Sequence, residues 1–262
     1  MSNPVSIHAG ATAGAKPLSN IAHLKDFQVI EFRRYAIREG ARAHFAQYFD
    51  TYFPEAFEQL GAIAAGSFLE RGNPNGFTWI RCFHRIEDRA VANAAFYYGP
   101  LWKEHKATLN DLMTDSDNVL LLRPLTPERG VTILPAVDPV TEAQGAQGIV
   151  AAQIFEVKAG MLEAFAKEAQ ATLAGYEAAG VREAGVLETL DVKNNFPQLP
   201  IRTDGPHLVW LGILRDDEML RNAFSPLAER ALESLSATGM LRGAPELVVM
   251  DPTHRSRLRW LP

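Results

Sequence analysis

The sequence contains one cysteine, no long apolar run and no broad basic face, and each absence excludes a class of protein. Because Cys82 is alone, neither an internal disulfide nor a metal site built from cysteines can form. No stretch approaches the roughly 18 apolar residues of a membrane span, and residues 1–25 lack the apolar core of a signal peptide. We therefore expect a soluble, cytoplasmic protein that does not act at a membrane.

Neither the charge nor the glycines indicate a nucleic acid or a nucleotide as partner. The formal net charge is −5 over 262 residues, whereas nucleic-acid-binding domains usually concentrate basic residues on one face. The glycines stand at turns and form no phosphate-binding loop, so no cofactor is expected. The single short basic cluster, residues 254–262, is interpreted either as a solvated tail or as an arm docked by Trp260.

What the chain does contain is a pattern that occurs twice. Gly40 and Gly160 each precede a phenylalanine by five residues, and Trp79 and Trp210 occupy matching places. The last proline of the pattern follows the tryptophan after 45 residues in the first half and after 42 in the second. A colinear series of such matches indicates two copies of one structural unit.

Each half predicts the element order βαββαβ. Alternating β-rich runs indicate strands, phenylalanines four apart indicate one helical face, and Pro54 should break the helix that contains it. The first half predicts strand 27–37, helix 40–61, strand 62–70, a turn at 73–76, strand 77–83, helix 88–113 interrupted at Gly99, and strand 118–124. The second predicts strand 149–157, helix 161–178, strands 183–190 and 207–214, helix 217–238 and strand 246–250.

Such a unit folds into a four-stranded antiparallel sheet whose helices cover one face. The other face is apolar and must be buried, most simply against the sheet of the second unit. The predicted fold class is therefore α+β, with two ferredoxin-like repeats forming an intramolecular, pseudo-dimeric α+β barrel. The predicted organisation is a flexible segment 1–25, a first repeat 26–125, a linker 126–148, a second repeat 149–253 and a basic tail 254–262.

The first half also resembles a known family. The stretches that carry the resemblance, over most of residues 27–125, are IEFRRYAIREG, GSFLERGNPNGFTWIRCF and LLLRPL. They are similar to the NIPSNAP family of the dimeric α+β barrel superfamily, and the second half fits more loosely. The resemblance implies the fold. That superfamily includes cofactor-free monooxygenases, isomerases, haem-using enzymes and plain binding proteins, so the fold does not choose the activity.

A polar row on the first strand is one candidate site. Glu31, Arg33 and Tyr35 share a face, because successive side chains of a strand alternate. Buried charge requires partners, so the row is either an internally satisfied ion pair or the lining of a pocket. The counterparts in the second half are less polar: Ala151, Gln153 and Phe155.

The third strand carries a second candidate group. Trp79 and Arg81 share one of its faces and His84 takes the other, where the second half has Gly212 and Arg215. Arg81 could steady an anion, and His84 could serve as a general base near neutral pH or as a haem ligand. The alternative for His84 is an exposed residue at the end of a strand.

Three further segments complete the candidate residues. Residues 85–89 are interpreted as the start of a helix, since acidic residues favour a helix N-terminus. Trp102 is expected to pack beneath the sheet with His105 near the same face, and no metal site is expected without a second histidine at ligand spacing. In the long loop 191–206, Phe196 could cap an apolar mouth and Arg202 could face an anion. Alternatively, the loop extends a strand or contacts a second chain.

The function expected from these residues is binding of a small hydrophobic or aromatic molecule, with conversion of it left open. A cofactor-free oxygenase or isomerase would use Tyr35 and Arg33 as hydrogen-bond donors, Arg81 to hold an anion and His84 as base. A non-enzymatic scaffold and a haem-binding protein are the alternatives. Substrate, reaction and pairing of two such chains in a homodimer or higher oligomer stay open. The ligand-binding candidates are Glu31, Arg33, Trp79, Trp102, His105, Phe196 and Arg202.

Overall fold

The computed structural model describes residues 22–261, and its strands form one closed antiparallel barrel. The strand order around the barrel is β1-β3-β2-β8-β5-β7-β6-β4, so each half contributes one four-stranded sheet. The halves join where β2 pairs with β8 and β4 pairs with β6. The predicted pseudo-dimeric α+β barrel is confirmed.

Both halves follow the predicted βαββαβ order. The first unit consists of β1 (Val29–Ile37), α1 (Arg42–Tyr52), α2 (Pro54–Gln59), β2 (Ile63–Glu70), β3 (Gly76–Phe83), α3 (Ile86–Tyr97), α4 (Pro100–Leu112) and β4 (Met113–Pro124). The second consists of β5 (Ile149–Glu156), α5 (Leu162–Ala178), β6 (Arg182–Thr189), β7 (His207–Leu214), α6 (Asp217–Met219), the π-helical turn η4 (Leu220–Phe224), α7 (Ser225–Ala237) and β8 (Glu246–Pro252). Short 3₁₀ turns lie at η2 (Ala22–Leu24) and η3 (Pro127–Arg129).

The inside of the barrel is an aliphatic core. Side chains from both sheets, such as Ile30 and Ile80 from the first unit and Val209 from the second, are fully buried there. Cys82 lies among them and is fully buried, as expected of a cysteine that acts as a small hydrophobe. The interior is thus a packed core, and the two cavities described below lie outside it.

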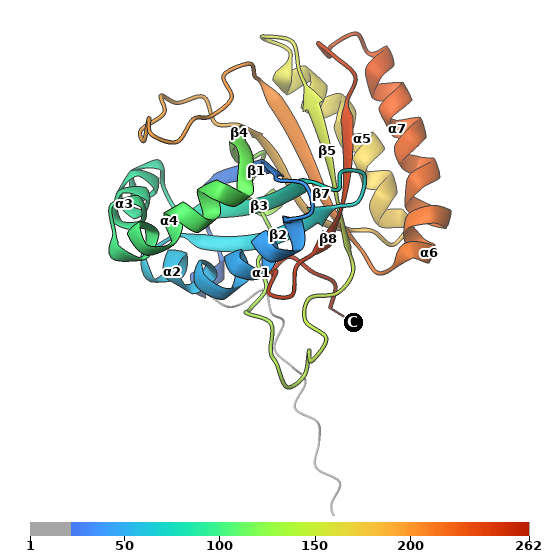
Figure 1. Cartoon of the computed structure of the whole chain (residues 1–262). Coiled ribbons are helices and arrows are strands. Elements are labelled where there is room, and N and C mark those ends of the chain that lie inside the picture. The colour runs from blue at the N-terminus through green and yellow to red at the C-terminus, as the bar shows by residue number, and fades with distance from the viewer. Residues whose placement is uncertain (1–21, 262) are drawn as a thin grey trace, which may run out of the picture.

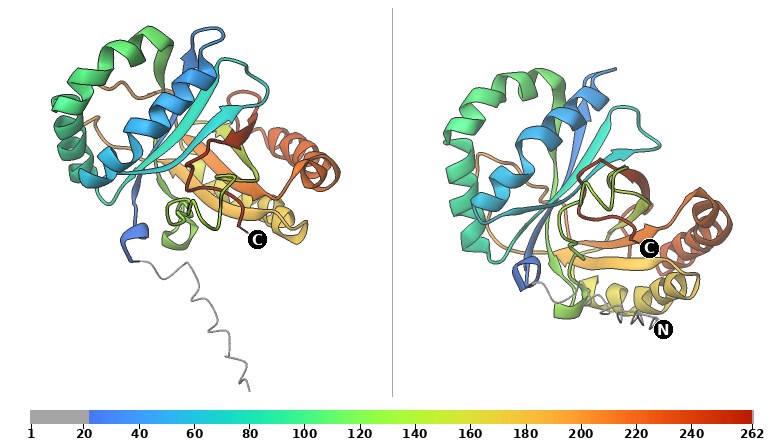
Figure 2. Two further views of the ribbon diagram at one scale, coloured as in Figure 1. Left: turned by 60° about the horizontal axis from the view of Figure 1, so that its bottom comes forward. Right: turned by 90° about the horizontal axis from the view of Figure 1, so that it is seen from below.

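The helices form two outer layers, one on each sheet (Figure 1). Helices α1 to α4 cover the first sheet, and α5 and α7 cover the second (Figure 2). The break predicted at Pro54 is where α1 ends and α2 begins. The four phenylalanines of that face, at most 4% exposed, pack on the first sheet: Phe45, Phe49, Phe53 and Phe57.

The linker and the C-terminal segment cross the same end of the barrel (Figure 2). Leu258 is fully buried in the barrel core, and Ile133 of the linker joins it there. Arg259 is 2% exposed and donates to Glu142, with 2.5 Å between Nε and Oε1. Of the two expectations for residues 254–262, the structure shows the docked arm.

The flexible segment expected over residues 1–25 lies mostly outside the described residues. Within them, Leu24 of η2 is 5% exposed and belongs to the barrel core. No helix in the stretch 22–261 is both long enough and apolar enough to cross a membrane.

Candidate functional site

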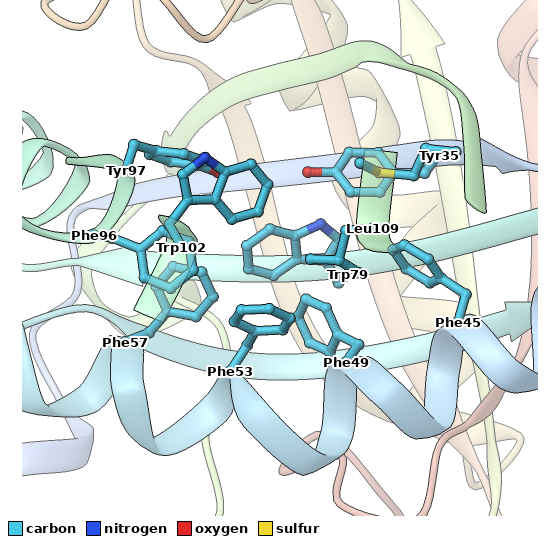
Figure 3. Close-up of a pocket in the computed structure, with 11 residues that line it drawn as sticks. Tyr35, Phe45, Phe49, Phe53, Phe57, Trp79, Phe96, Tyr97, Trp102 and Leu109 are labelled. Atoms are coloured by element: carbon cyan, nitrogen blue, oxygen red, sulfur yellow. The ribbon is translucent and has the colours of Figure 1, made fainter. Parts of the chain in front are cut away.

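An aromatic chamber lies between the first sheet and its helices (Figure 3). Its free volume is about 40 Å³. The rings lie close together, with centroids 4.2 Å apart for Phe57 and Phe96 and 5.0 Å apart for Phe49 and Trp79. The chamber is lined by Tyr35, Phe45, Phe49, Phe53, Phe57, Trp79, Phe96, Tyr97, Trp102, Leu109 and Met113.

A larger cavity of about 340 Å³ adjoins the chamber, and we call it the mouth cavity. The two cavities lie side by side, because they share four lining residues: Tyr35, Tyr97, Trp102 and Met113. Besides these, the mouth cavity is lined by Arg33, Tyr98, Asn110, Ser116, Phe196, Gln198 and Leu199.

The second unit closes the mouth cavity through its long loop, residues 191–206. This loop leaves its own unit and lies over α3 and α4 of the first (Figure 1). The Phe196 ring stacks on Tyr97 with centroids 6.0 Å apart, and Gln198 donates to the Tyr98 hydroxyl at 2.9 Å. Phe196 was expected to cap an apolar opening, and its ring forms part of the wall of the mouth cavity.

Beside the chamber lies a fully buried charge cluster of one carboxylate and three guanidinium groups. Glu31 Oε2 accepts from Arg81 Nε at 2.8 Å and Nη2 at 2.5 Å, and from Arg33 Nη1 at 3.0 Å. Glu31 Oε1 accepts from Arg89 Nε at 2.7 Å. Arg33 also donates from Nε to the Tyr35 hydroxyl at 2.8 Å. Of these three arginines, Arg33 lines the mouth cavity.

The cluster carries more positive than negative charge. Burial by itself would raise the pKa of Glu31, but attraction to Arg81, Arg33 and Arg89 outweighs it and holds that pKa far below its ordinary range. Glu31 is therefore ionised at neutral pH, and one negative charge faces three positive ones. Unbalanced charge away from water costs several kcal/mol per ion, on the order of the stability of a domain.

Several polar atoms around the cluster have no hydrogen-bond partner. Within residues 22–261, Trp79 Nε1, Arg81 Nη1, Arg89 Nη2 and both side-chain amide atoms of Asn93 are buried without one. Arg89 and Asn93 lie one helical turn apart on α3, so they share a face. Unpaired buried groups are rare in folded proteins. The Nε1 atom of Trp210, the counterpart of Trp79, is also without a partner, so the arginine and asparagine atoms are what sets the first unit apart.

Sequence reasoning missed Arg89, because it interpreted residues 85–89 as a helix start. The helix start is confirmed, since α3 begins at Ile86 with Glu87 and Asp88 in its first turn, but Arg89 is fully buried. It also donates from Nη1 to Asn194 and Asn195 of the long loop, at 3.0 and 2.8 Å. A signal was present: Arg89, Asn93 and Phe96 stand at the i, i+4, i+7 spacing of one buried helix face.

The second unit has the same framework without the charge. Glu31 pairs across the sheet with Arg81, and the corresponding pair is Ala151 with Gly212. A Cβ atom on Gly212 would lie 2.2 Å from the Trp210 ring, so that ring fills the space that a larger side chain would need. The expected difference between the units is confirmed: at the same place in the paired strands, the first unit has two charged residues and the second has none.

His84 does not lie with the other candidates. It is exposed just beyond the end of β3, where its ring stacks on Phe27 with centroids 4.3 Å apart. Its Nδ1 lies 3.2 Å from the carbonyl oxygen of Asp26. The expectation of a base or haem ligand beside Tyr35 and Arg81 is wrong for His84, because its strand face points away from the helix layer.

Trp102 and His105 have different places. Trp102 lines both cavities, as expected of a ring beneath the sheet. His105 is 7% exposed, lies 2.6 Å from the Tyr48 hydroxyl through Nδ1 and stacks on Tyr52. It is absent from the lining of both cavities, so its expected role as a ligand-binding residue is not supported.

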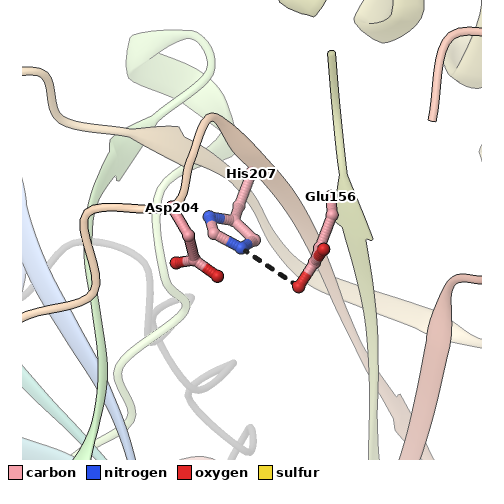
Figure 4. Close-up of side chains that lie close together, drawn as sticks. All are labelled: Glu156, Asp204 and His207. Atoms are coloured by element: carbon pink, nitrogen blue, oxygen red, sulfur yellow. Dashed lines mark ion pairs between the residues drawn. The ribbon is translucent and has the colours of Figure 1, made fainter. Parts of the chain in front are cut away.

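Glu156, Asp204 and His207 lie close together (Figure 4). Arg202 contacts both carboxylates of this cluster. Its Nη2 donates to Glu156 at 2.7 Å and to Asp204 at 2.6 Å. The two carboxylates and the imidazole are close enough together to hold a metal ion, but the guanidinium already bridges both carboxylates. Arg202 thus holds the base of the long loop against β5, and it does not line the mouth cavity as expected.

No protein-family model and no curated protein matches the chain. Among solved structures, a Lactobacillus acidophilus protein named "putative monooxygenase" matches over 90% of this chain and 98% of its own, with a TM-score of 0.55 and 12% identity. A Fusobacterium nucleatum protein of the same name matches over 90% and 96%, with a TM-score of 0.59 and 9% identity. An "anthrone oxidase-like protein" matches over 91% and 98%, with a TM-score of 0.55 and 10% identity.

Structures of NIPSNAP proteins match a smaller part of the chain. One from Burkholderia xenovorans covers 37% of this chain and 95% of its own, with a TM-score of 0.35 and 17% identity. NIPSNAP proteins, which the first half resembles, are thus among the structures to which this chain is similar. The likeness over the whole chain is one of fold: two ferredoxin-like units closed into a dimeric α+β barrel within a single chain.

Proposed function

We propose that this protein binds a small aromatic molecule in the mouth cavity and chamber of its first unit, and converts it without a bound cofactor. The observation that carries the proposal is the pair of adjoining cavities rich in aromatic side chains, with Phe196 of the other unit in the wall of the larger one. The mouth cavity, about 340 Å³, lies in the size range of small-molecule sites, and such sites are mostly apolar with a few polar groups.

Hydrogen-bond donors stand at the part of the mouth cavity next to the charge cluster. Arg33, Tyr35 and Tyr97 line the mouth cavity, and burial raises the pKa of the Tyr97 phenol, which keeps it protonated. Donors held in place around a ligand oxygen stabilise negative charge that develops there. This supports chemistry through an enolate or phenolate, the step that cofactor-free oxygenases and isomerases share.

The lining residues include no carboxylate and no imidazole. The nearby carboxylates of Asp115 and Asp117 line a neighbouring pocket that shares Asn110, Met113 and Ser116 with the mouth cavity. A substrate that loses its proton easily needs no base among the residues of the two cavities. This favours ligands such as phenols and anthrones. The haem alternative is not supported through His84, the histidine considered for it, since His84 lines neither cavity.

Binding can be tested with the neutral probe 2-naphthamide, followed by quenching of tryptophan fluorescence. Leu199→Trp should fill the mouth cavity and weaken binding at least about tenfold, equivalent to ~1.4 kcal/mol. Val192→Trp is the matched control, because Val192 is 39% exposed in the same loop. If neither 2-naphthamide nor its carboxylate analogue 2-naphthoate binds saturably to the wild type, or if both variants bind equally, the proposed site is refuted.

Conversion can be tested with anthrone, chosen because one structural neighbour is described as anthrone oxidase-like. Anthrone and dioxygen yield anthraquinone and water, with the substrate supplying all the electrons. We expect oxygen uptake that depends on the wild-type protein and is lost in Leu199→Trp. If 2-naphthamide binds but no oxygen is consumed, the protein is a binding protein for this substrate class.

A further inference from the structure

We infer that the molecule bound in the mouth cavity is an anion, whose carboxylate or enolate oxygens lie against Arg33 and are held by the surplus charge of the buried cluster. The inference rests on the proposed function, because it assigns the charge of the ligand to the same cavity. Three observations carry it: the charge imbalance, the distribution of the Glu31 contacts, and the unpaired polar atoms.

The charge imbalance comes first. Glu31, Arg81 and Arg89 have side chains that are 0% exposed, and the Arg33 side chain is 2% exposed. Attraction to the arginines keeps Glu31 ionised, so its single negative charge offsets one of the three positive charges. A surplus of two positive charges in a buried layer is costly unless an anion balances it. No further carboxylate of residues 22–261 contacts these three guanidinium groups.

The contacts of Glu31 place the surplus at the cavity. Arg81 uses two nitrogens on Oε2, and Arg89 takes Oε1. Arg33 makes one longer bond of 3.0 Å to the carboxylate already held by the other two. Arg33 is therefore the least neutralised of the three, and it is the one that lines the mouth cavity beside Tyr35.

Most of the unpaired atoms beside the cluster are hydrogen-bond donors, and the exception is Oδ1 of Asn93. Arg81 Nη1, Arg89 Nη2 and Trp79 Nε1 are donors without an acceptor within the described part of the chain. Trp79 lines the chamber, and the Arg81 guanidinium lies 6.0 Å from the ring of Tyr97, which lines both cavities. An oxyanion supplies acceptors, whereas a hydrocarbon ligand supplies none.

A purely structural role for the cluster does not account for the second unit. There the same layer is built with Ala151, Gln153 and Gly212, and Gln153 is satisfied by the Tyr176 hydroxyl at 2.8 Å. The fold thus needs no arginine at this place. The cluster is a feature of the one unit whose helix layer holds the aromatic chamber and the mouth cavity.

The test compares two probes of nearly equal shape, 2-naphthoate and the neutral 2-naphthamide, by fluorescence titration of the whole protein. We expect wild type to bind 2-naphthoate at least about tenfold more tightly, and the preference to shrink as salt is raised. Arg33→Met should abolish the preference, because it should weaken binding of 2-naphthoate far more than binding of 2-naphthamide. Arg85→Met, which removes an exposed arginine, should leave both affinities unchanged.

Arg33→Lys tests whether a lost preference comes from unfolding. It keeps the positive charge and loses the hydrogen bond from Arg33 Nε to the Tyr35 hydroxyl, so it should retain part of the preference for 2-naphthoate. Equal binding of both probes by wild type would overturn the inference and leave the proposed function standing. Binding of neither would remove both. If inorganic phosphate or chloride raises the melting temperature but 2-naphthoate does not compete with it, the cluster holds a free anion and the inference fails.

Discussion

Glu31 on β1 and Arg89 on α3 form a fully buried ion pair, with 2.7 Å between Oε1 and Nε. The pair joins a strand to the helix that covers it, and Arg89 continues to the asparagines of the loop from the second unit. One carboxylate thus ties together the sheet, the helix layer and the lid. The carboxylate of Glu31 therefore holds in place the arginines beside the mouth cavity.

Replacing Glu31 by Gln should strongly destabilise the protein. The change leaves three buried guanidinium groups without a counter-charge, and breaking a buried pair typically costs about 3–5 kcal/mol. Urea unfolding followed by circular dichroism measures the loss. The matched control is Asp111→Asn, whose pair with Arg38 is exposed and should contribute less than about 1 kcal/mol. Equal stability of the two variants would show that the cluster is neutralised in another way.

The fold could be predicted from the sequence because its signals are local. The spacing of Phe45 to Phe57, the turn at 73–76 and the break at Pro54 each follow from neighbouring residues, and the repeat of the pattern adds the barrel. Arg89 could not be separated from Arg85 by the acidic start of a helix. The spacing of Arg89 to Asn93 and Phe96 does indicate a buried helix face, but nothing local indicates its partner Glu31, which lies 58 residues away.

The sequence of loop 191–206 predicts that the loop is ordered and apolar, but it does not predict where the loop docks. Proline, Phe196 and Leu199 indicate an ordered apolar loop, but its docking on α3 and α4 of the other unit depends on how the two sheets close. Arg202 shows the same limit, since it stands in the same loop and yet turns back to Glu156. Side-chain direction within an irregular loop has no periodicity from which it can be derived.

Phe196→Ala should open the site without unfolding the protein. The ring closes the mouth cavity against Tyr97, and aromatic pairs contribute about 0.5–1.5 kcal/mol beyond the area they bury. We expect the dissociation rate of 2-naphthoate to rise about tenfold in stopped-flow fluorescence, with a smaller change in the association rate. Val192→Ala, an exposed position in the same loop, is the control. An unchanged dissociation rate would show that the loop is not a lid.

His84→Ala should leave ligand binding unchanged. The imidazole is exposed, and its neighbours are Phe27 and the carbonyl of Asp26, neither of which lines the site. Titration with 2-naphthoate and oxygen uptake with anthrone should both stay within about twofold of wild type. A loss of oxygen uptake with unchanged binding would restore the catalytic role that the sequence suggested for this histidine.

Gly212→Ala should destabilise the second unit without affecting the site in the first. The new Cβ atom would meet the Trp210 ring at 2.2 Å, and overpacking of a filled core costs about 1–3 kcal/mol. Gly175→Ala is the control. It lies inside α5 with open space around it, so the change should stabilise the helix by about 0.5–1 kcal/mol. Thermal unfolding and 2-naphthoate titration of both variants check this.

The stability of the protein should fall in mildly acidic solution in a way that depends on His207. Burial, and next the charge of Arg202, lower the pKa of His207 below its ordinary value. The unfolded chain binds a proton there below about pH 6.5. In the folded chain, His207 takes up the proton only at a lower pH. The stability that the protein has above about pH 6.5 is therefore lost as the pH falls from there toward the lowered pKa of His207.

His207→Gln removes this titration while keeping a polar side chain of similar reach. The free energy of unfolding in urea, measured at pH 7.5 and at pH 5.5, should therefore fall less in the variant than in wild type. His44→Gln, at an exposed position on α1, should keep the wild-type difference. An equal fall in wild type and His207→Gln would mean that the imidazole takes up its proton in the folded protein, drawn by Glu156 and Asp204 despite the nearby guanidinium of Arg202.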